Sequence, residues 1–153
     1  VMDIFVKVAC HIVRGGTLEV VGKTFNGLKD LREFSPRVTD DGKKITGSVI
    51  YIDNYGNVVT NIQKSLFEAY RKGRSFELHA RTSLITKIFD NYSEIVNYDL
   101  DKSKRKGAGD LLALFNSSGY IELAIYKSNL TTVGGASTLL GLDYRDTITI
   151  NFT

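Results

Sequence analysis

The sequence predicts an all-β fold, a small antiparallel Greek-key-like barrel of about seven strands, preceded by a helix and a connecting segment. Three observations lead to this prediction. From Ile45 onward the apolar residues recur with a period near two, as in half-buried strands. Asn, Asp and Gly cluster between the apolar runs, where they favour tight turns. Only one short helix is predicted among the strands, and many short strands joined by turns are typical of a barrel or a sandwich.

The first predicted element is a helix over residues 3–13. Ile4, Val8 and Ile12 recur every four residues and form an apolar stripe, and a Gly-Gly pair then supplies a C-terminal stop. Residues 17–44 are polar, punctuated by glycine and contain the one proline of the chain, so they are predicted to be a connecting segment.

The β-region is predicted to run from residue 45 to residue 153. Its strands are predicted at 48–52, 58–62, 75–80, 84–89, 111–115, 120–126 and 147–152. A short helix is expected at 65–72, with Ser65 as its cap and Gly73 as its stop. The charged stretch 98–109 ends in glycine and is predicted to be a solvated loop.

Composition excludes several classes of protein. The net charge of +3 is mild, and a local cluster of basic residues lies at 102–106, so composition does not indicate nucleic-acid binding. No apolar run is long enough to span a membrane, and charged residues interrupt the apolar N-terminal stretch, so no signal peptide is expected. The single cysteine, Cys10, excludes an internal disulfide. These features predict a cytoplasmic protein that contacts neither nucleic acid nor membrane.

The common catalytic signatures are absent from the sequence. It contains no Gly-rich phosphate loop, HExxH, CxxC or G-x-S-x-G. His11 and His79 have no acidic or cysteine partner at the spacing of a metal site, so both are interpreted as structural and no metal is expected. Cys10 falls in the apolar pattern of the first helix and is predicted to be buried.

Two loops carry residues that suit ligand binding. Residues 53–57, Asp-Asn-Tyr-Gly-Asn, place a carboxylate, an aromatic ring and a carboxamide within five positions at the end of a strand. A carboxylate binds an ammonium group, an aromatic face stacks on a heterocycle, and an amide pairs with a purine edge. Residues 116–119, Asn-Ser-Ser-Gly, offer hydroxyl and N–H groups to a carboxylate. Both loops also have the composition of ordinary β-turns, and that interpretation stays open.

Four stretches of the sequence together resemble the C-terminal domain of the S-adenosylmethionine (SAM) hydroxide adenosyltransferases, relatives of the fluorinase and chlorinase. They are 47–62 (GSVIYIDNYGNVVTNI), 91–94 (NYSE), 111–124 (LLALFNSSGYIELA) and 136–142 (ASTLLGL). The first and third are the specific ones. Residues 2–14 also resemble the helix that closes the α/β N-terminal domain of that family. The resemblance therefore implies a terminal helix of that domain at 1–16, a connection at 17–44 and a SAM-binding barrel at 45–153.

The resemblance implies the hydrolysis of SAM to adenosine and L-methionine, in which water or hydroxide attacks the 5′ carbon. It implies no cofactor, since SAM is the substrate, and a homotrimer with the active site between subunits. The family's water-activating Asp, Arg and His belong to the N-terminal domain and would precede this sequence, so no catalytic residue is expected within it. This part is expected to supply the surface that binds adenine and methionine.

The resemblance also assigns roles to single positions. It implies that Asp53 binds the methionine ammonium and that Tyr55 stacks on adenine. The further positions are Asn57 at the adenine edge, Tyr92 as a second aromatic at the purine, Ser117 at the methionine end, Glu122 as a polar residue at the pocket, and the backbone near Tyr126 at the Watson–Crick edge of adenine. Ser118 stands where the fluorinase has an arginine, which favours hydroxide over halide chemistry.

Two other interpretations remain open. The first is a non-catalytic nucleoside-binding or oligomerisation domain, which fits the lack of a proton-transfer group. The second takes the basic cluster at 102–106 as an RNA contact, although the aromatic residues are not interleaved with it as a stacking surface requires. Residues 97–107 look like an insertion relative to the family.

Overall fold

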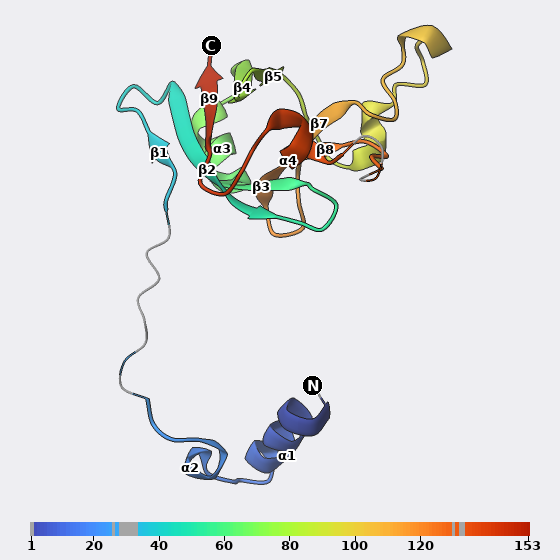
Figure 1. The fold of residues 1–153 in the computed structure, drawn as a ribbon. Helices are drawn as coiled ribbons and strands as arrows, with labels where there is room; N and C mark the ends of the chain where they lie inside the picture. Colours follow the sequence, from blue (N-terminus) through green and yellow to red (C-terminus); the bar gives the residue numbers. More distant parts are fainter. Residues whose placement is uncertain (1, 26, 28–33, 130, 132–133) are drawn as a thin grey trace. The chain divides into compact units, whose positions relative to one another are not determined.

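A computed structural model describes residues 2–25, 27, 34–129, 131 and 134–153 (Figure 1). The chain forms two compact units, Val1–Glu33 and Phe34–Thr153. The first is helical and the second is built almost entirely of strands. None of the helices in these residues is both long and apolar enough to cross a bilayer.

The N-terminal unit confirms the predicted helix and corrects the prediction for Cys10. A π-helical turn, η1 (Met2–Val6), leads into α1 (Lys7–Val13), and one further turn forms α2 (Leu18–Val21). The chain leaves α1 through Gly15, which has a φ of +80°, and the imidazole of His11 hydrogen-bonds the carbonyl oxygen of Thr17 at 2.9 Å. Cys10 is exposed rather than buried, because the helices of this unit bury none of their residues against one another.

The second unit confirms the all-β prediction. Its strands are β1 (Arg37–Val38), β2 (Lys44–Ile52), β3 (Val58–Gln63), β4 (Phe76–Ala80), β5 (Ser83–Ile85), β6 (Ile88–Phe89), β7 (Leu111–Phe115), β8 (Tyr120–Ile125) and β9 (Thr147–Phe152). They lie in the order β5-β4-β9-β2-β3-β8-β7-β6, with β1 added beside β2. The sheet curls into a nearly closed barrel. Its neighbouring strands are antiparallel, except that β6 and β7 are parallel.

The strand prediction at 84–89 was wrong, because the chain forms two short strands there. β5 pairs with β4, and two residues later β6 pairs in parallel with β7 at the other end of the strand order. A change of partner within so few residues requires a break in the strand, and this break brings the two ends of the sheet together. The predicted connection at 17–44 contains α2 and β1; its residues 26 and 28–33 lie outside the described part of the chain.

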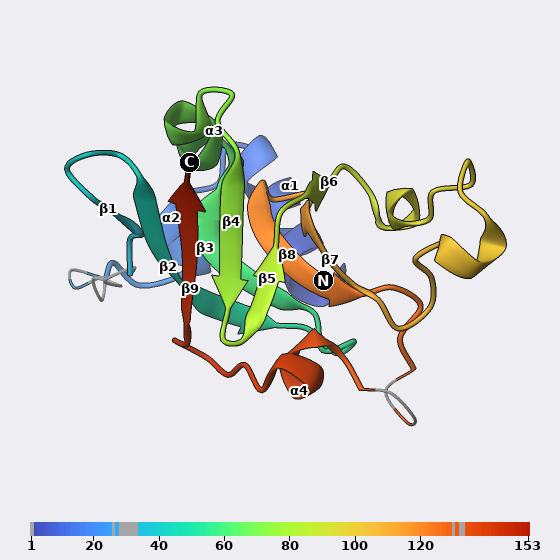
Figure 2. The same cartoon turned by 90° about the horizontal axis from the view of Figure 1, so that it is seen from above.

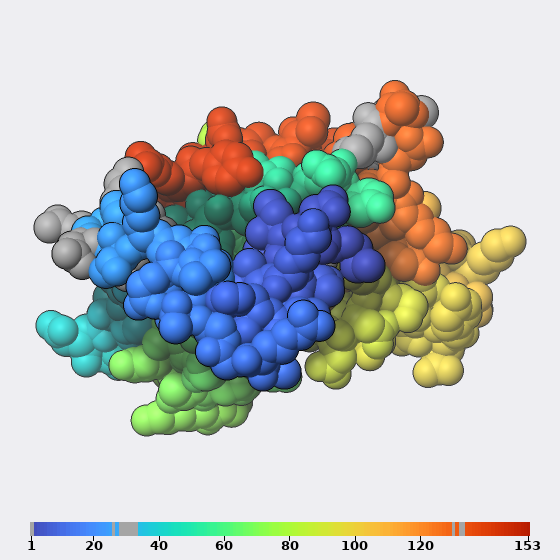
Figure 3. All heavy atoms as spheres, turned by 90° about the horizontal axis from the view of Figure 1, so that it is seen from below, coloured from blue at the N-terminus to red at the C-terminus, as the bar shows by residue number. Residues whose placement is uncertain are grey.

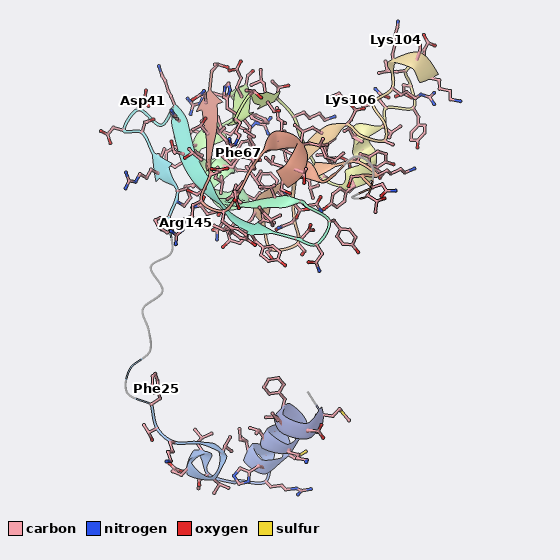
Figure 4. All side chains as sticks on the ribbon, viewed as in Figure 1. Phe25, Asp41, Phe67, Lys104, Lys106 and Arg145 are labelled. Carbon is pink, nitrogen blue, oxygen red and sulfur yellow. The ribbon has the colours of Figure 1, made fainter. Side chains whose placement is uncertain are left out.

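The interior of the barrel is filled by an aromatic group around Phe67. This residue lies on α3 (Lys64–Arg71), is 1% exposed, and its ring centroid is 5.1 Å from that of Phe76 and 5.7 Å from those of Phe115 and Phe152. Figure 4 labels it within the barrel. The helix begins one residue earlier than predicted, with Gln63 as its N-cap, so the prediction that Ser65 caps it was wrong.

Two short helices matter for the site. The 3₁₀ turn η2 (Tyr92–Ile95) contacts β6 and β7 on the outer face of the sheet, where it covers a second apolar cluster that includes Ile95, Leu112 and Ala124. The helix α4 (Ala136–Leu140) lies at the opposite end of the barrel from α3 (Figure 2). Neither η2 nor α4 was predicted from the sequence.

The charged stretch at 98–109 is a loop whose residues are mostly exposed, as predicted. It contains the 3₁₀ turn η3 (Lys102–Lys104), and the guanidinium of Arg105 donates to the carbonyl oxygens of Leu100 and Tyr98, each at 2.7 Å. This loop stands out from the side of the barrel in Figures 1 and 3.

Candidate functional site

The loop between β2 and β3 is organised by the carboxylate of Asp53. Its Oδ1 accepts the backbone N–H groups of Tyr55 and Asn57, both at 2.8 Å, and its Oδ2 accepts the side-chain Nδ2 of Asn57 at 3.0 Å. Gly56 adopts a φ of +72°, which favours glycine and lets the chain reverse. The carboxylate therefore fixes the loop, while Oδ2 keeps lone-pair capacity for a further donor.

A second segment, at the start of α4, contacts the backbone of this loop. The N–H of Ser137, in the first turn of α4, donates to the carbonyl oxygen of Gly56 at 2.9 Å. At Gly135 a Cβ atom would lie 2.5 Å from the carbonyl oxygen of Tyr55 and 2.6 Å from the Cα of Gly56. Because no side chain fits in that space, glycine at 135 permits the close approach of α4 to the loop.

Glu122 is a buried carboxylate beside this loop. It lies on β8 opposite Val59 of β3 and Leu114 of β7, and it is 7% exposed because η2 covers that face of the sheet. Its Oε1 accepts the hydroxyl of Tyr92, and its Oε2 accepts Nδ2 of Asn116 at 3.3 Å. The carboxylate thus joins η2 to the β7–β8 hairpin, which satisfies a charge that burial would otherwise make costly.

Tyr92 is held in its protonated form at this position. Burial raises the pKa of its hydroxyl well above the ordinary value, and the hydrogen bond to Glu122 and the negative charges of Glu122 and Asp53 raise it further. Tyr92 therefore stays a hydrogen-bond donor to Glu122 at neutral pH, and its ring remains 41% exposed.

The hairpin at 116–119 is organised by Asn116. Its side-chain oxygen accepts the N–H groups of Ser118 and Tyr120, both at 3.1 Å, and its amide nitrogen reaches Glu122. Ser117 and Ser118 are exposed at the tip. The sequence analysis treated Asn116 as a turn residue, and only its contact with Glu122 reveals that it connects the hairpin to the site.

The predicted residues fall into a central group and a more distant one. Hydrogen bonds join Asp53, Tyr55 and Asn57 within the loop. A second set joins Glu122 to Tyr92 and to Asn116 of the hairpin that carries Ser117 and Ser118. The pairing of β3 with β8 sets Glu122 opposite Val59, two residues beyond Asn57, and so brings the two sets to neighbouring strands. Tyr126 is half-buried beyond β8, where its backbone N–H donates to the carbonyl oxygen of Asp110 at 2.9 Å and its carbonyl oxygen accepts the N–H of Gly109 at 2.8 Å.

Within the described ranges, no three His, Cys, Asp or Glu side chains lie together as a set of metal ligands. His79 lies 3.4 Å from Glu77 and apart from the residues above. What the site offers is a fixed carboxylate, an aromatic ring (Tyr55) that is 71% exposed, and a carboxamide, all on a rigid loop. A barrel domain with this combination carries groups whose chemistry suits a cation and a heterocycle.

Comparison with known proteins places the chain in a family. The C-terminal domain of the SAM hydroxide adenosyltransferases matches residues 47–149, and the chain belongs to this family. The resemblance that the four sequence stretches suggested is confirmed.

Individual relatives agree with the family. The chain is 29% identical over 111 residues to a (R)-S-adenosyl-L-methionine hydrolase of Methanocaldococcus jannaschii, a match that covers 72% of this chain and 36% of the relative. A crystal structure of an uncharacterized conserved protein from Thermotoga maritima is similar with a TM-score of 0.62 and 26% identity, over 97% of this chain and 50% of that one. A conserved hypothetical protein from Thermus thermophilus shares the fold, with a TM-score of 0.54 and 18% identity, over 99% of this chain and 52% of that one. The chain thus spans about half the length of these two structures, and its match covers 36% of the length of the hydrolase.

Proposed function

We propose that the full-length protein hydrolyses SAM to adenosine and L-methionine, and that Phe34–Thr153 supplies the surface that binds adenine and methionine. The observation that carries this proposal is the loop of Asp53, in a chain that belongs to the SAM hydroxide adenosyltransferase family. Two N–H groups occupy Oδ1, whereas Oδ2 accepts only one, so an ammonium group can bind there without disturbing the loop.

The proposed reaction needs little assistance from this domain beyond binding. The oxygen of water forms a bond to the 5′ carbon of SAM while the bond from that carbon to sulfur breaks. The sulfonium leaves as the neutral thioether of methionine, and one proton passes to a base. Asp53 and Glu122 are both engaged in holding neighbouring groups. We therefore assign water activation to an Asp, an Arg and a His of the N-terminal domain, as the family resemblance implies.

Each residue of the surface receives a proposed role in binding. Asp53 binds the methionine ammonium, Tyr55 stacks on adenine, and the side-chain oxygen of Asn57 accepts from the adenine edge. Tyr92 contacts the purine with the open part of its ring, and Glu122 positions Tyr92. Ser117 contacts the methionine end, and Ser118 favours water over a halide ion as the nucleophile.

The backbone near Tyr126 is proposed to contact the Watson–Crick edge of adenine, but not through the peptide groups of Tyr126 itself. The N–H and carbonyl groups of Tyr126 itself are paired with Asp110 and Gly109, so the contact falls to the peptide groups beside it. We further propose that the full-length protein is a cytoplasmic homotrimer with the site between subunits, which sedimentation velocity of the purified protein tests directly.

The activity is tested by incubating the full-length protein with SAM in isotopically labelled water. We expect adenosine and methionine in equal amounts, with the label in the 5′ hydroxyl of adenosine. Because the curated relative is named for the (R) form, both sulfonium epimers of SAM are assayed separately. Halide salts are added in parallel, and a 5′-halogenated nucleoside would contradict the assignment of water as nucleophile.

The alternative is a nucleoside-binding or oligomerisation domain without catalysis. Binding of SAM or adenosine in calorimetry, with no adenosine formed over long incubation of either epimer, would favour this alternative. Formation of methylthioadenosine and labelled homoserine, in place of labelled adenosine, would mean that a different carbon–sulfur bond is cleaved.

A further inference from the structure

A cavity separate from the candidate SAM surface opens beside the charged loop. Its volume is about 450 Å³, and it lies between the β5–β6 turn, η2, β7 and the loop that contains η3. Leu84, Leu100 and Leu111 form the accessible part of its apolar floor, whereas Phe89, Ile95 and Leu112 in the same lining are buried. A cavity of this size accommodates a small organic molecule.

The rim of the cavity is basic. Lys87 on the β5–β6 turn and Lys104 and Lys106 on the loop line it from two sides, and Figure 4 labels the two loop lysines. Across the residues that the structure describes, none of these three ammonium groups lies within ion-pair distance of a carboxylate. Three cations gathered around an apolar floor form a favourable site for an anion.

The acidic residues of the lining are already engaged. Glu94 accepts the backbone N–H of Asp90 at 3.1 Å and the side-chain amide of Asn91 at 2.6 Å. Asp110 accepts the N–H of Gly107 at 2.7 Å. Both carboxylates therefore stabilise turns of the cavity wall. The ammonium of Lys87 lies 4.6 Å from the centre of the Phe89 ring, and within the described residues its charge, like those of Lys104 and Lys106, is not neutralised by a carboxylate.

The loop is held in the shape that forms this wall. The guanidinium of Arg105 turns back to bond the carbonyl oxygens of Leu100 and Tyr98, and it lies 5.4 Å from the centre of the Tyr98 ring. The guanidinium of Arg105 therefore makes its contacts within the loop, while the neighbouring Lys104 and Lys106 line the cavity. A loop fixed in this way loses little conformational entropy when a ligand binds.

We infer that this cavity binds a small organic anion, an aromatic or aliphatic body that carries a carboxylate, sulfonate or phosphate. The apolar body contacts Leu84, Leu100 and Leu111, and the anionic group lies between Lys87 and the loop lysines. A nucleic acid fits less well, because Tyr98 is the one aromatic residue of the loop and the guanidinium of Arg105 already lies over one face of its ring. Binding here does not depend on the proposed hydrolysis of SAM.

Two fluorescent probes of nearly the same body test the inference on the full-length protein. Anilinonaphthalene sulfonate carries the anionic group, and N-phenylnaphthylamine lacks it. We expect the sulfonate to bind more tightly than the neutral probe, and its affinity to fall as salt is raised while that of the neutral probe stays constant. Saturating SAM or adenosine should not displace the sulfonate.

Variants locate the binding. Lys104→Gln and Lys106→Gln should each weaken the sulfonate by roughly 3- to 5-fold, the size expected for exposed charge pairs. Lys102→Gln is the matched control, because Lys102 lies on the same turn but does not line the cavity. Thr86→Phe fills the cavity from an exposed position and should abolish binding of both probes, with the melting temperature checked for each variant.

Several results would overturn the inference. Equal losses in Lys102→Gln and Lys104→Gln would show a general charge effect rather than a site. Unchanged binding in Thr86→Phe, or displacement of the sulfonate by SAM, would place the probe elsewhere. Equal affinity for the two probes would mean that the lysine rim selects no anion.

Discussion

At the scale of single residues, the candidate site depends on two carboxylates with different surroundings. Asp53 lies at a strand end and uses its oxygens to shape an exposed loop. Glu122 lies under η2, is almost fully buried, and accepts from Tyr92 and Asn116. Asp53 is therefore open to a ligand, whereas Glu122 can affect ligand binding only through the side chains that it positions.

Replacing Asp53 by Asn in the full-length protein should weaken SAM binding by roughly 10- to 150-fold, because a charge-assisted hydrogen bond to an ammonium is typically worth about 1.5–3 kcal/mol. The amide retains one oxygen for the N–H groups of Tyr55 and Asn57, so the loop should persist. Calorimetry with SAM and with adenosine checks this prediction. Adenosine lacks methionine and should lose much less affinity, and equal losses for both would mean that Asp53 only shapes the loop.

Replacing Tyr55 by Ala should weaken SAM and adenosine alike, by roughly 1–3 kcal/mol, if its ring stacks on adenine. Because the side chain is largely exposed, the melting temperature should hardly change. Calorimetry and thermal denaturation together make the test. Unchanged affinity for both ligands would leave Tyr55 as an ordinary turn residue.

Replacing Tyr92 by Phe should destabilise the fold by roughly 1–3 kcal/mol at neutral pH, because the buried carboxylate of Glu122 loses a donor. The pKa of Tyr92 is raised in the folded state, so its contribution is complete below the unfolded value of about 10 and is lost as the pH rises above it. Urea denaturation between neutral pH and about pH 11 should therefore show a steeper alkaline loss in the natural protein than in the variant. Parallel curves would contradict the assignment.

At the scale of elements, the site is a hairpin loop supported by a helix that is distant in sequence. The loop after β2 presents the binding groups, and α4 fixes its position through Ser137 and the close approach at Gly135. The turn η2 supplies the other side of the site and seals the apolar cluster beneath it. The elements that carry the site are thus short, and their positions depend on the strands to which they attach.

Replacing Gly135 by Ala should push the loop away from α4, because the new methyl group would meet the backbone of Tyr55 and Gly56 at less than contact distance. Overpacking of this kind typically costs about 1–3 kcal/mol, and SAM affinity should fall as well. Gly107→Ala is the matched control, since no atom lies within 4 Å of its added Cβ. Thermal denaturation and calorimetry of both variants test the claim, and equal behaviour of the two would refute it.

At the scale of the whole molecule, the barrel is a scaffold that brings distant segments to one surface. β3 lies between β2 and β8, so the loop of Asp53 and the strand of Glu122 become neighbours although about seventy residues separate them. Phe67 holds the interior together through three aromatic contacts. The integrity of the site therefore depends on a core residue that touches none of the proposed ligand groups.

Replacing Phe67 by Ala should destabilise the protein by about 3–5 kcal/mol, the usual cost of a large cavity in a packed core. Leu139→Ala removes an apolar side chain that is half exposed and should cost far less. Urea denaturation of the two variants gives the comparison. A loss from Phe67→Ala no larger than that from Leu139→Ala would show that the aromatic group is not the centre of the core.

Much of the fold and part of the site could be predicted from the sequence. Strands 111–115 and 147–152 were predicted with their observed bounds, because the continuous apolar run of the first and the alternation of the second are both local properties of the sequence. The loop at 53–57 could also be identified from the sequence, because the side chains of turn residues such as Asp and Asn hydrogen-bond to the backbone of the same turn. The family was recognisable because its specific stretches are continuous in the sequence, whereas the ligand roles of single residues stay predictions.

Only the tertiary structure decided which residues share the site. The break between β5 and β6 follows from closing the sheet, the burial of Glu122 from η2 lying over β8, and the need for glycine at 135 from the approach of α4 to the loop. Each of these depends on segments far apart in the chain, and no local pattern encodes such a pairing. Alternation along β8 is satisfied equally whether a covering turn buries Glu122 or water surrounds it, so its burial could be decided only by the packing of the whole barrel.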